Sequence, residues 1–311
     1  MTYALAVHGG AGTIRRDALS PDRADAYHAG LRRALEAGGA VLARGGSALD
    51  AVCAAVCALE DDPLFNAGRG AVFTAAGTQE MDAAVMDGRD RRAGAVAGIV
   101  GPRNPVLAAR AVMERTRHVL LMGSGALAVA REAGLPFEAA PYFFTQARWD
   151  ALEAVRRLAA EGRVTDDPAT RHGTVGAVAR DAAGHLAAAT STGGMTGKAA
   201  GRVGDTPLVG AGTFAEDATC AVSGTGHGEV FVRWSAAAEI AARMRHRGEG
   251  VEAAARHVVM EDLAPNDGSG GVIAVDRAGR VAMPRNCEGM YRGWLQEGEG
   301  PRTAIHDEAR G

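Results

Sequence analysis

The chain has 311 residues and a mass of 31.9 kDa, and 47% of its residues are hydrophobic, so it can bury a core as one large domain or two ordinary ones. Its 34 basic and 37 acidic residues give a formal net charge of -3 without any block of like charge. This balance excludes the electrostatic footprint of a nucleic-acid or membrane-surface protein, and we expect a small-molecule substrate.

The first half of the chain begins with a predicted buried strand, residues 3–7, which we expect to end at the glycine-rich HGGAGT. Ser20 predicts the cap of a helix that reaches about residue 44, and Ser47 predicts the cap of a second helix through Leu59. The pattern then changes to short strands with the sequences GAVFT, EMDAAVMDG and AGAVAGIVG, followed by helices near 105–116 and 124–133. A block of strands argues against a regular alternation of strands and helices.

The second half follows a helical stretch at 151–158 and a polar linker, 161–173, with the sequence EGRVTDDPATRHG. Beyond the linker, TVGAVARD and HLAAATST predict a hairpin, and GGVIAVDRAGRVAMP predicts another. Between them we expect a strand, CAVSGTG, and two helices, 231–245 and 251–260. Strands and helices in both halves suit two sheets covered by two helical layers.

The sequence shows no clear pattern for secretion, membrane insertion, disulfide bonds or a cysteine metal site. The N-terminus lacks a basic segment followed by a long apolar one, and no stretch reaches the roughly 18 apolar residues of a membrane span. The four cysteines are too few and too scattered for a disulfide framework, and Cys53 and Cys57 lack the partner pair of a metal site. These features predict a cytoplasmic enzyme that binds neither a membrane nor nucleic acid.

Thr174 stands between the polar linker and the apolar run VGAVAR. A threonine hydroxyl is a weak nucleophile that needs a base, such as a His, a Lys or its own α-amino group. That amino group titrates near ~7.7–8 and is a base only when free, so its use requires a chain break before Thr174. Gly173 has no side chain to hinder attack on its carbonyl. Spacing alone also fits a threonine that simply begins a strand.

Seven segments resemble, in order, the plant-type L-asparaginase/isoaspartyl peptidase family of N-terminal-nucleophile hydrolases. They are HGGAG, PLFNAGRGAVFT, EMDAAVMDG, HGTVGAVARD, AAATSTGGMTGKAAGRVGDTPLVGAG, SGTGHGE and EGMYR. The resemblance spans nearly the whole chain and implies an α+β fold, a four-layer αββα sandwich, as a single domain over 1–311. It also implies self-cleavage between Gly173 and Thr174 into subunits 1–173 and 174–311, and a dimer of such cleaved protomers.

The same resemblance implies an activity, the hydrolysis of L-asparagine and β-aspartyl peptides to L-aspartate. Thr174 is then the nucleophile and, through its free amine, the base, while Thr192 hydrogen-bonds and orients it. The Thr225 hydroxyl and the Gly226 N–H would bind the oxyanion, whose donors each contribute about 10²- to 10³-fold in rate. Thr190 and Thr192 share one face of a strand, so a plain cross-strand threonine is the other interpretation of Thr192.

The aspartyl half of such a substrate carries a carboxylate and an ammonium group, which need one cation and one anion. Arg202 and Asp205 match the family's pair, and Gly228 would assist through its backbone. Without the resemblance, an Arg and an Asp three residues apart indicate a surface salt bridge.

Asn66 resembles the family's active-site asparagine, whereas His8 is better explained as a structural histidine. The segment LEDDPLFNAGR resembles the family's sodium loop, so the resemblance implies a structural Na⁺ and no cofactor for catalysis. A loop ordered without any ion is the alternative. The implied ligands are the backbone carbonyls of Leu59, Glu60, Asp62, Phe65, Ala67 and Arg69.

Three residues depart from the family pattern, Gly224, Arg285 and Cys287, and they bear on substrate preference rather than on the type of reaction. A glycosylasparaginase-like amidase is a related alternative, although its motif usually has Asp where this chain has Gly173. Glycine-rich turns such as GSGAL also suggest a nucleotide-binding or non-enzymatic protein, but GGMTGKAAG lacks the P-loop pattern.

Overall fold

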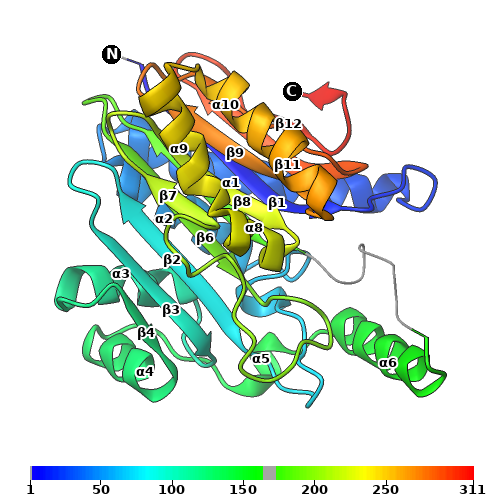
Figure 1. The fold of residues 1–311 in the computed structure, drawn as a ribbon. Coiled ribbons are helices and arrows are strands. Elements are labelled where there is room, and N and C mark those ends of the chain that lie inside the picture. Colours follow the sequence, from blue (N-terminus) through cyan, green and yellow to red (C-terminus); the bar gives the residue numbers. More distant parts are fainter. Residues whose placement is uncertain (1, 164–172) are drawn as a thin grey trace.

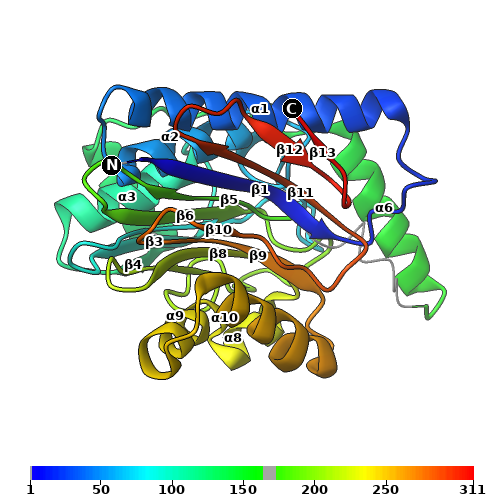
Figure 2. The same ribbon diagram turned by 90° about the horizontal axis from the view of Figure 1, so that it is seen from above.

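Four layers stack as helices, sheet, sheet and helices in the computed structural model, which describes residues 2–163 and 173–311 (Figure 1, Figure 2). The predicted four-layer αββα sandwich is confirmed. Linker residues 164–172 lie outside the described residues, and with them most of the predicted linker.

The larger of the two sheets has nine strands among the described residues, in the spatial order β13-β12-β11-β1-β5-β6-β2-β3-β4. Their bounds are β1 Ala4–Gly12, β2 Met81–Asp87, β3 Ala93–Ile99, β4 Leu120–Met122, β5 Val175–Arg180, β6 Leu186–Thr192, β11 Gly289–Gln296, β12 Arg302–Ala304 and β13 Ala309–Arg310. Neighbouring strands pair antiparallel, except the parallel pair β3 and β4. The predicted hairpin of β5 and β6 therefore lies near the middle of the sheet.

Helices α1, α2 and α3 cover the outer face of the large sheet (Figure 2). Their starts follow the sequence closely, because Ser20 Oγ accepts the Arg23 N–H at 3.3 Å and Ser47 Oγ accepts the Asp50 N–H at 3.1 Å. The bounds on this side are α1 Pro21–Ala43, α2 Ala48–Glu60, η1 Gly68–Gly70, α3 Pro105–Arg115, α4 Gly123–Glu132, α5 Ala140–Phe143 and α6 Gln146–Ala160. Helix α6 extends to one side of the layers (Figure 1).

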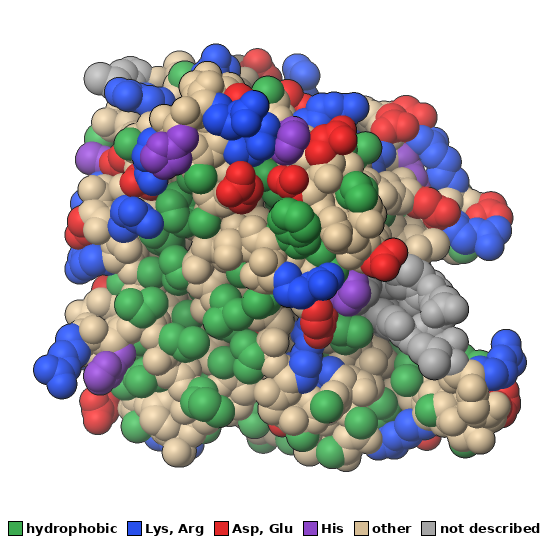
Figure 3. Space-filling model, in the orientation of Figure 1, with side chains coloured by type: hydrophobic (Ala, Val, Ile, Leu, Met, Phe, Trp, Pro, Cys, Tyr) green, Lys and Arg blue, Asp and Glu red, His purple; other side chains and the backbone are tan. Residues whose placement is uncertain are grey.

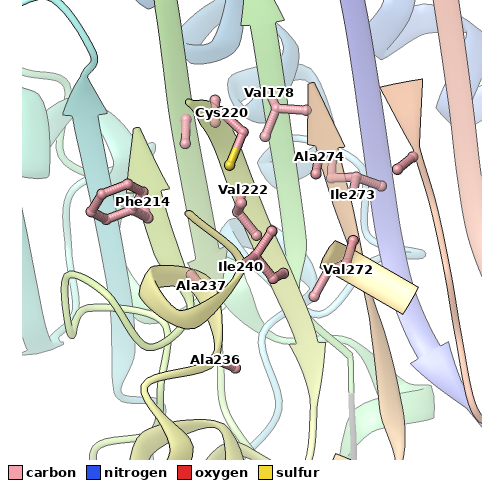
Figure 4. Packing of buried hydrophobic residues seen from close by; sticks show 14 of the residues in the cluster. Val178, Phe214, Cys220, Val222, Ala236, Ala237, Ile240, Val272, Ile273 and Ala274 are labelled. Carbon is pink, nitrogen blue, oxygen red and sulfur yellow. The ribbon is translucent and has the colours of Figure 1, made fainter. Parts of the chain in front are cut away.

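The smaller sheet has the order β10-β9-β8-β7, and helices α8 to α10 cover its outer face (Figure 2). The bounds are β7 Thr213–Ala215, β8 Cys220–Gly226, α8 Gly228–Trp234, α9 Ala236–Arg247, α10 Val251–His257, η2 Val258–Leu263, η3 Ala264–Asn266, β9 Gly270–Asp276 and β10 Val281–Ala282. Figure 4 shows the packing of this half, where side chains such as Val178 of β5, Val222 of β8 and Ile240 of α9 meet. Apolar side chains therefore join the two sheets and the second helical layer.

Three sequence predictions about elements are wrong. Strand β1 does not end at residue 7 but continues through the glycine-rich segment to Gly12, because β11 pairs with it on both sides of a bulge between His8 and Gly10. The GAVFT segment forms only an isolated bridge at Thr74. The single helix expected at 231–245 is two helices, because Ser235 adopts a left-handed φ of 46° between α8 and α9.

Candidate active site

The register of β5 and β6 brings Thr174 and Thr192 together. Val175 pairs with Ser191, so the residue before β5 lies opposite the last residue of β6. The Thr174 hydroxyl donates to Thr192 Oγ1 at 3.2 Å, and both side chains are buried. Alternation along each strand turns Thr174 and Thr192 toward the space between the sheets. The structure thus places them in contact, as the sequence predicts.

The carbonyl oxygen of Gly173 has two donors. Asn66 Nδ2 donates to it at 2.7 Å, and the Thr192 hydroxyl donates to it at 3.0 Å. The amide of Asn66 has a fixed orientation, because its Oδ1 accepts the Val72 N–H at 2.9 Å and its Nδ2 also donates to the Gly194 carbonyl at 2.7 Å. The peptide bond next to Thr174 is therefore polarised by two side chains that neighbouring groups hold in position.

Behind Thr174, His8 ties β1 to β5 and β8. Its Nδ1 donates to the Thr174 carbonyl at 2.9 Å, and its Nε2 lies 2.9 Å from Ser223 Oγ. Burial lowers the pKa of His8 to about 3, so the ring is neutral, with its proton on Nδ1 and a hydroxyl proton received at Nε2. Ser223 Oγ is also hydrogen-bonded to the Thr190 hydroxyl, at 2.7 Å. His8 has the contacts of a structural residue and does not touch the Thr174 hydroxyl.

A small pocket opens beside Thr174 and contains both Arg202 and Asp205. Gly228 packs against both, since a Cβ there would come within 2.9 Å of Arg202 Nη2 and 2.8 Å of Asp205 Oδ1. Burial raises the pKa of Asp205 to about 7, and its Oδ2 has no hydrogen-bond partner among the described residues. The pair therefore presents a cation and a titratable carboxyl group to the pocket rather than forming a surface salt bridge.

Glu229 is a site residue that sequence reasoning missed. Its carboxylate accepts two hydrogen bonds from Arg202, both at 2.9 Å. Such a bidentate pair fixes the plane of the guanidinium group. Its only signal in the sequence was its place next to Gly228, at the start of helix α8.

The end of β8 brings Gly226 to the same pocket, and Thr225 precedes it in the strand. Gly226 lines the pocket with Thr174. Thr225 is buried, and its Oγ1 accepts the Ala11 N–H at 3.3 Å, which leaves its own hydroxyl proton to donate. The departure at Gly224 also has a structural reason, because a Cβ there would lie 2.8 Å from the Phe231 ring. Phe231 fills the space that a larger residue at 224 would need.

The other two departures lie outside the pocket beside Thr174. Arg285 donates to Asp307 at 2.6 Å, and Cys287 Sγ lies 3.3 Å from the Gly289 carbonyl. Lys198, the lysine of the GGMTGKAAG segment that lacks the P-loop pattern, is buried and donates to the Glu80 carbonyl at 2.7 Å. Its segment is a turn rather than the start of a helix, so it does not form a phosphate cradle.

Two glycines of the segment after α2 lie close to backbone carbonyl oxygens. Gly68 has a φ of +51°, and a Cβ there would lie 2.5 Å from the Glu60 carbonyl oxygen. At Gly70 a Cβ would lie 2.0 Å from the Phe65 oxygen. These are two of the six predicted carbonyl ligands, and carbonyl oxygens are ligands that suit a hard cation. No cluster of three or more His, Cys, Asp or Glu side chains that could hold a metal occurs in the described part of the chain.

Comparison with known sequences decides the family. The family described as asparaginase matches residues 1–305. The chain belongs to the asparaginase family. An isoaspartyl peptidase of Salmonella typhimurium is 52% identical, covering 98% of each chain, and one of Escherichia coli is 51% identical, covering 98% of this chain and 96% of its own. A plant-type L-asparaginase of Pyrococcus furiosus is 41% identical, covering 95% and 97%.

This asparaginase-family chain is therefore a hydrolase of the N-terminal-nucleophile type, and the resemblance inferred from its motifs is confirmed. Among residues 2–163 and 173–311, every helix is too short or too polar to cross a bilayer.

Proposed function

We propose that this protein cleaves itself between Gly173 and Thr174 and then hydrolyses β-aspartyl peptides and L-asparagine, releasing L-aspartate. One observation carries the proposal. The Thr174 hydroxyl is hydrogen-bonded to Thr192, while Thr192 and Asn66 together donate to the Gly173 carbonyl. A nucleophile, a polarised carbonyl and its oxyanion donors thus meet at a single peptide bond.

Self-cleavage follows from this arrangement. Attack by Thr174 Oγ1 on the Gly173 carbonyl carbon forms a C–O bond and turns the carbonyl into an oxyanion, which Asn66 and Thr192 stabilise. The hydroxyl proton passes to the Thr174 nitrogen as the C–N bond breaks, and Gly173 becomes an ester on Oγ1. Water hydrolyses the ester to a Gly173 carboxylate and leaves Thr174 with a free hydroxyl and a free α-amino group.

Hydrolysis of substrate uses the same hydroxyl with a new base. The freed α-amino group of Thr174 takes the hydroxyl proton as Oγ1 attacks the side-chain carbonyl of the substrate, and it returns that proton to the leaving nitrogen. The Thr225 hydroxyl and the Gly226 N–H serve the second oxyanion in this proposal, which is supported by Gly226 in the pocket lining and by Thr225 directly before it in β8. Water then releases L-aspartate from Thr174.

The two charged ends of the aspartyl half fit the pocket. Arg202 is held by Glu229 and binds the α-carboxylate, while the ionised form of Asp205 binds the α-ammonium. Gly228 lies against both side chains and supports the pair. The pocket offers only about 10 Å³ with Gly173 in place, so the substrate's aspartyl group needs the space that Gly173 vacates on cleavage.

We also propose a structural Na⁺ held by the carbonyls of Leu59, Glu60, Asp62, Phe65, Ala67 and Arg69, which supports the loop that carries Asn66. Catalysis itself uses no cofactor in this proposal.

For assembly we propose a dimer of cleaved protomers in the cytoplasm. Exposed apolar side chains support self-association, notably Met122, 70% exposed at the edge strand β4. Figure 3 shows apolar side chains gathered over this side of the large sheet. The four free cysteines are in keeping with a reducing compartment.

The test is the intact mass of purified protein after incubation at neutral pH, together with turnover of a β-aspartyl dipeptide. We expect two fragments of roughly 18 and 14 kDa, given that a residue averages about 0.1 kDa, and measurable release of aspartate. Thr174→Ala should remain a single chain and lose activity, whereas Thr219→Ala, at a buried threonine whose hydroxyl donates to Glu216 in the turn between β7 and β8, should be cleaved normally. An uncut wild-type chain, or turnover by Thr174→Ala, would contradict the proposal.

A further inference from the structure

A second cavity lies against Gly173, next to the pocket beside Thr174. Gly173 lines both, so its backbone is a wall that they share. This cavity encloses about 220 Å³ and is formed by the end of β1 and the turn after it, helix α1, β11 and the start of α6. It is much larger than the pocket that contains Arg202 and Asp205. In the proposed cleavage, the release of Gly173 would remove this shared wall.

Arginine side chains distinguish this cavity. Arg15, Arg23 and Arg148 line it, and none of its described lining residues is Asp or Glu. Arg15 is paired with Asp17 outside the lining, so Arg23 and Arg148 are the two cations considered below. Arg148 donates to the Gly70 carbonyl at 2.9 Å and the Leu64 carbonyl at 3.2 Å, which are neutral acceptors. Within residues 2–163 and 173–311, neither Arg23 nor Arg148 lies within 4.0 Å of a carboxylate. The cavity is therefore suited to an anionic group.

Two stacked aromatic rings form the apolar part of the wall. The rings of Tyr27 and Tyr291 lie 4.0 Å apart between centroids, with an interplanar angle of 18°. The guanidinium of Arg23 lies 6.0 Å from the centre of the Tyr27 ring, and Ile14 and Leu19 also line the cavity. A ligand with one carboxylate and one apolar side chain would thus find a partner for each part.

We infer that this cavity binds the leaving half of a β-aspartyl peptide, with its free carboxylate on Arg23 and Arg148 and its apolar side chain against Tyr27 and Tyr291. The inference rests on the proposed function, because it takes the position of Gly173 as that of the scissile bond. Ammonia, the leaving group of L-asparagine, is too small to reach these residues. The cavity is therefore a specificity site for dipeptides over the free amino acid amide.

The experiment compares two substrates that differ only in the carboxylate, β-aspartyl-leucine and β-aspartyl-leucinamide. Wild-type protein should prefer the acid in kcat/KM. Arg23→Gln should lower the ratio of the two kcat/KM values about tenfold, the order of effect of one charge-assisted hydrogen bond. Arg23 is exposed on the first turn of α1, so the variant should fold and be cut like the wild type. Arg32→Gln, on the same helix but outside the cavity lining, is the matched control and should keep the ratio.

An unchanged ratio in Arg23→Gln, or no preference for the acid in the wild type, would overturn this inference alone. A wild-type chain that stays uncut and hydrolyses neither substrate would overturn the proposed function, and this inference with it. Mass spectrometry of each sample separates the two results.

Discussion

The buried carboxyl group of Asp205 predicts how substrate affinity depends on pH. Burial raises its pKa to about 7 in the free protein, so the group is partly protonated near neutral pH. A substrate ammonium beside it favours the ionised form, so the pKa of Asp205 is lower in the complex than in the free protein. Substrate affinity should therefore increase with pH up to about 7 and level off above it, because binding below that pH must release a proton.

This prediction is checked by measuring KM for L-asparagine across roughly pH 5 to 9, a range that spans the shifted carboxyl and the α-amine. Asp205→Asn should bind the substrate more weakly and lose the pH dependence of KM, while kcat keeps the dependence set by the Thr174 amine. Asp90→Asn, at an exposed residue paired with Arg92, is the control and should match the wild type. A pH-dependent KM that persists in Asp205→Asn would assign the titration to another group.

At the scale of elements, strand β1 supports Thr174, the proposed nucleophile, from behind. It lies between β11 and β5, and its bulge falls at the residues that approach Thr174. Gly10 has a φ of +116°, and a Cβ there would lie 3.1 Å from the Gly173 Cα. His8 donates to the Thr174 carbonyl and accepts from Ser223, so β1 fixes the backbone of Thr174 through one neutral ring. His8 is a positioning residue.

Removal of this ring should leave a buried carbonyl and a buried hydroxyl unpaired. His8→Leu is expected to lower the free energy of unfolding by about 1–3 kcal/mol, the cost of such an unsatisfied group. His8→Asn can still donate to the Thr174 carbonyl and should recover part of the loss in stability and in kcat. Denaturant unfolding of both variants measures the change in the free energy of unfolding. The pH profile of kcat should be the same in His8→Asn as in the wild type. If one side of that profile were lost or shifted in His8→Asn, His8 would be a catalytic base rather than a positioning residue.

Elements governed by local sequence were predictable, and those governed by distant partners were not. Ser20 and Ser47 cap their own helices, so the starts of α1 and α2 could be read directly. The extension of β1 depends on β11, more than 270 residues away in the chain, and no local pattern could show it. Thr174, Thr192 and Asn66 were accessible through motif resemblance. The partner of Arg202, Glu229, and the Arg23 cavity depend on packing between elements and required coordinates.

At the scale of the whole molecule, the proposed cut divides the chain but not the sheet. The fragment before Thr174 supplies β1 to β4, and the fragment from Thr174 onward supplies β5 to β13. In the order β13-β12-β11-β1-β5-β6-β2-β3-β4, strands of the two fragments are neighbours at β11/β1, β1/β5 and β6/β2. Separation of the fragments would break three ladders of backbone hydrogen bonds and expose the face of β1, with Ala4 and Ala6, that packs on the small sheet.

The cleaved protein should therefore run as one species under native conditions and release its two fragments only in denaturant. Native mass spectrometry should give a particle that contains both fragments, whereas denaturing spectra give each alone. Because folding of the cleaved protein requires two chains to meet, its recovery after dilution from denaturant should be lower than that of the uncut Thr174→Ala variant. A higher protein concentration should narrow the difference. Fragments that separate on a native column, or that refold as well as the single chain at every concentration, would show that the interleaved sheet does not bind them together.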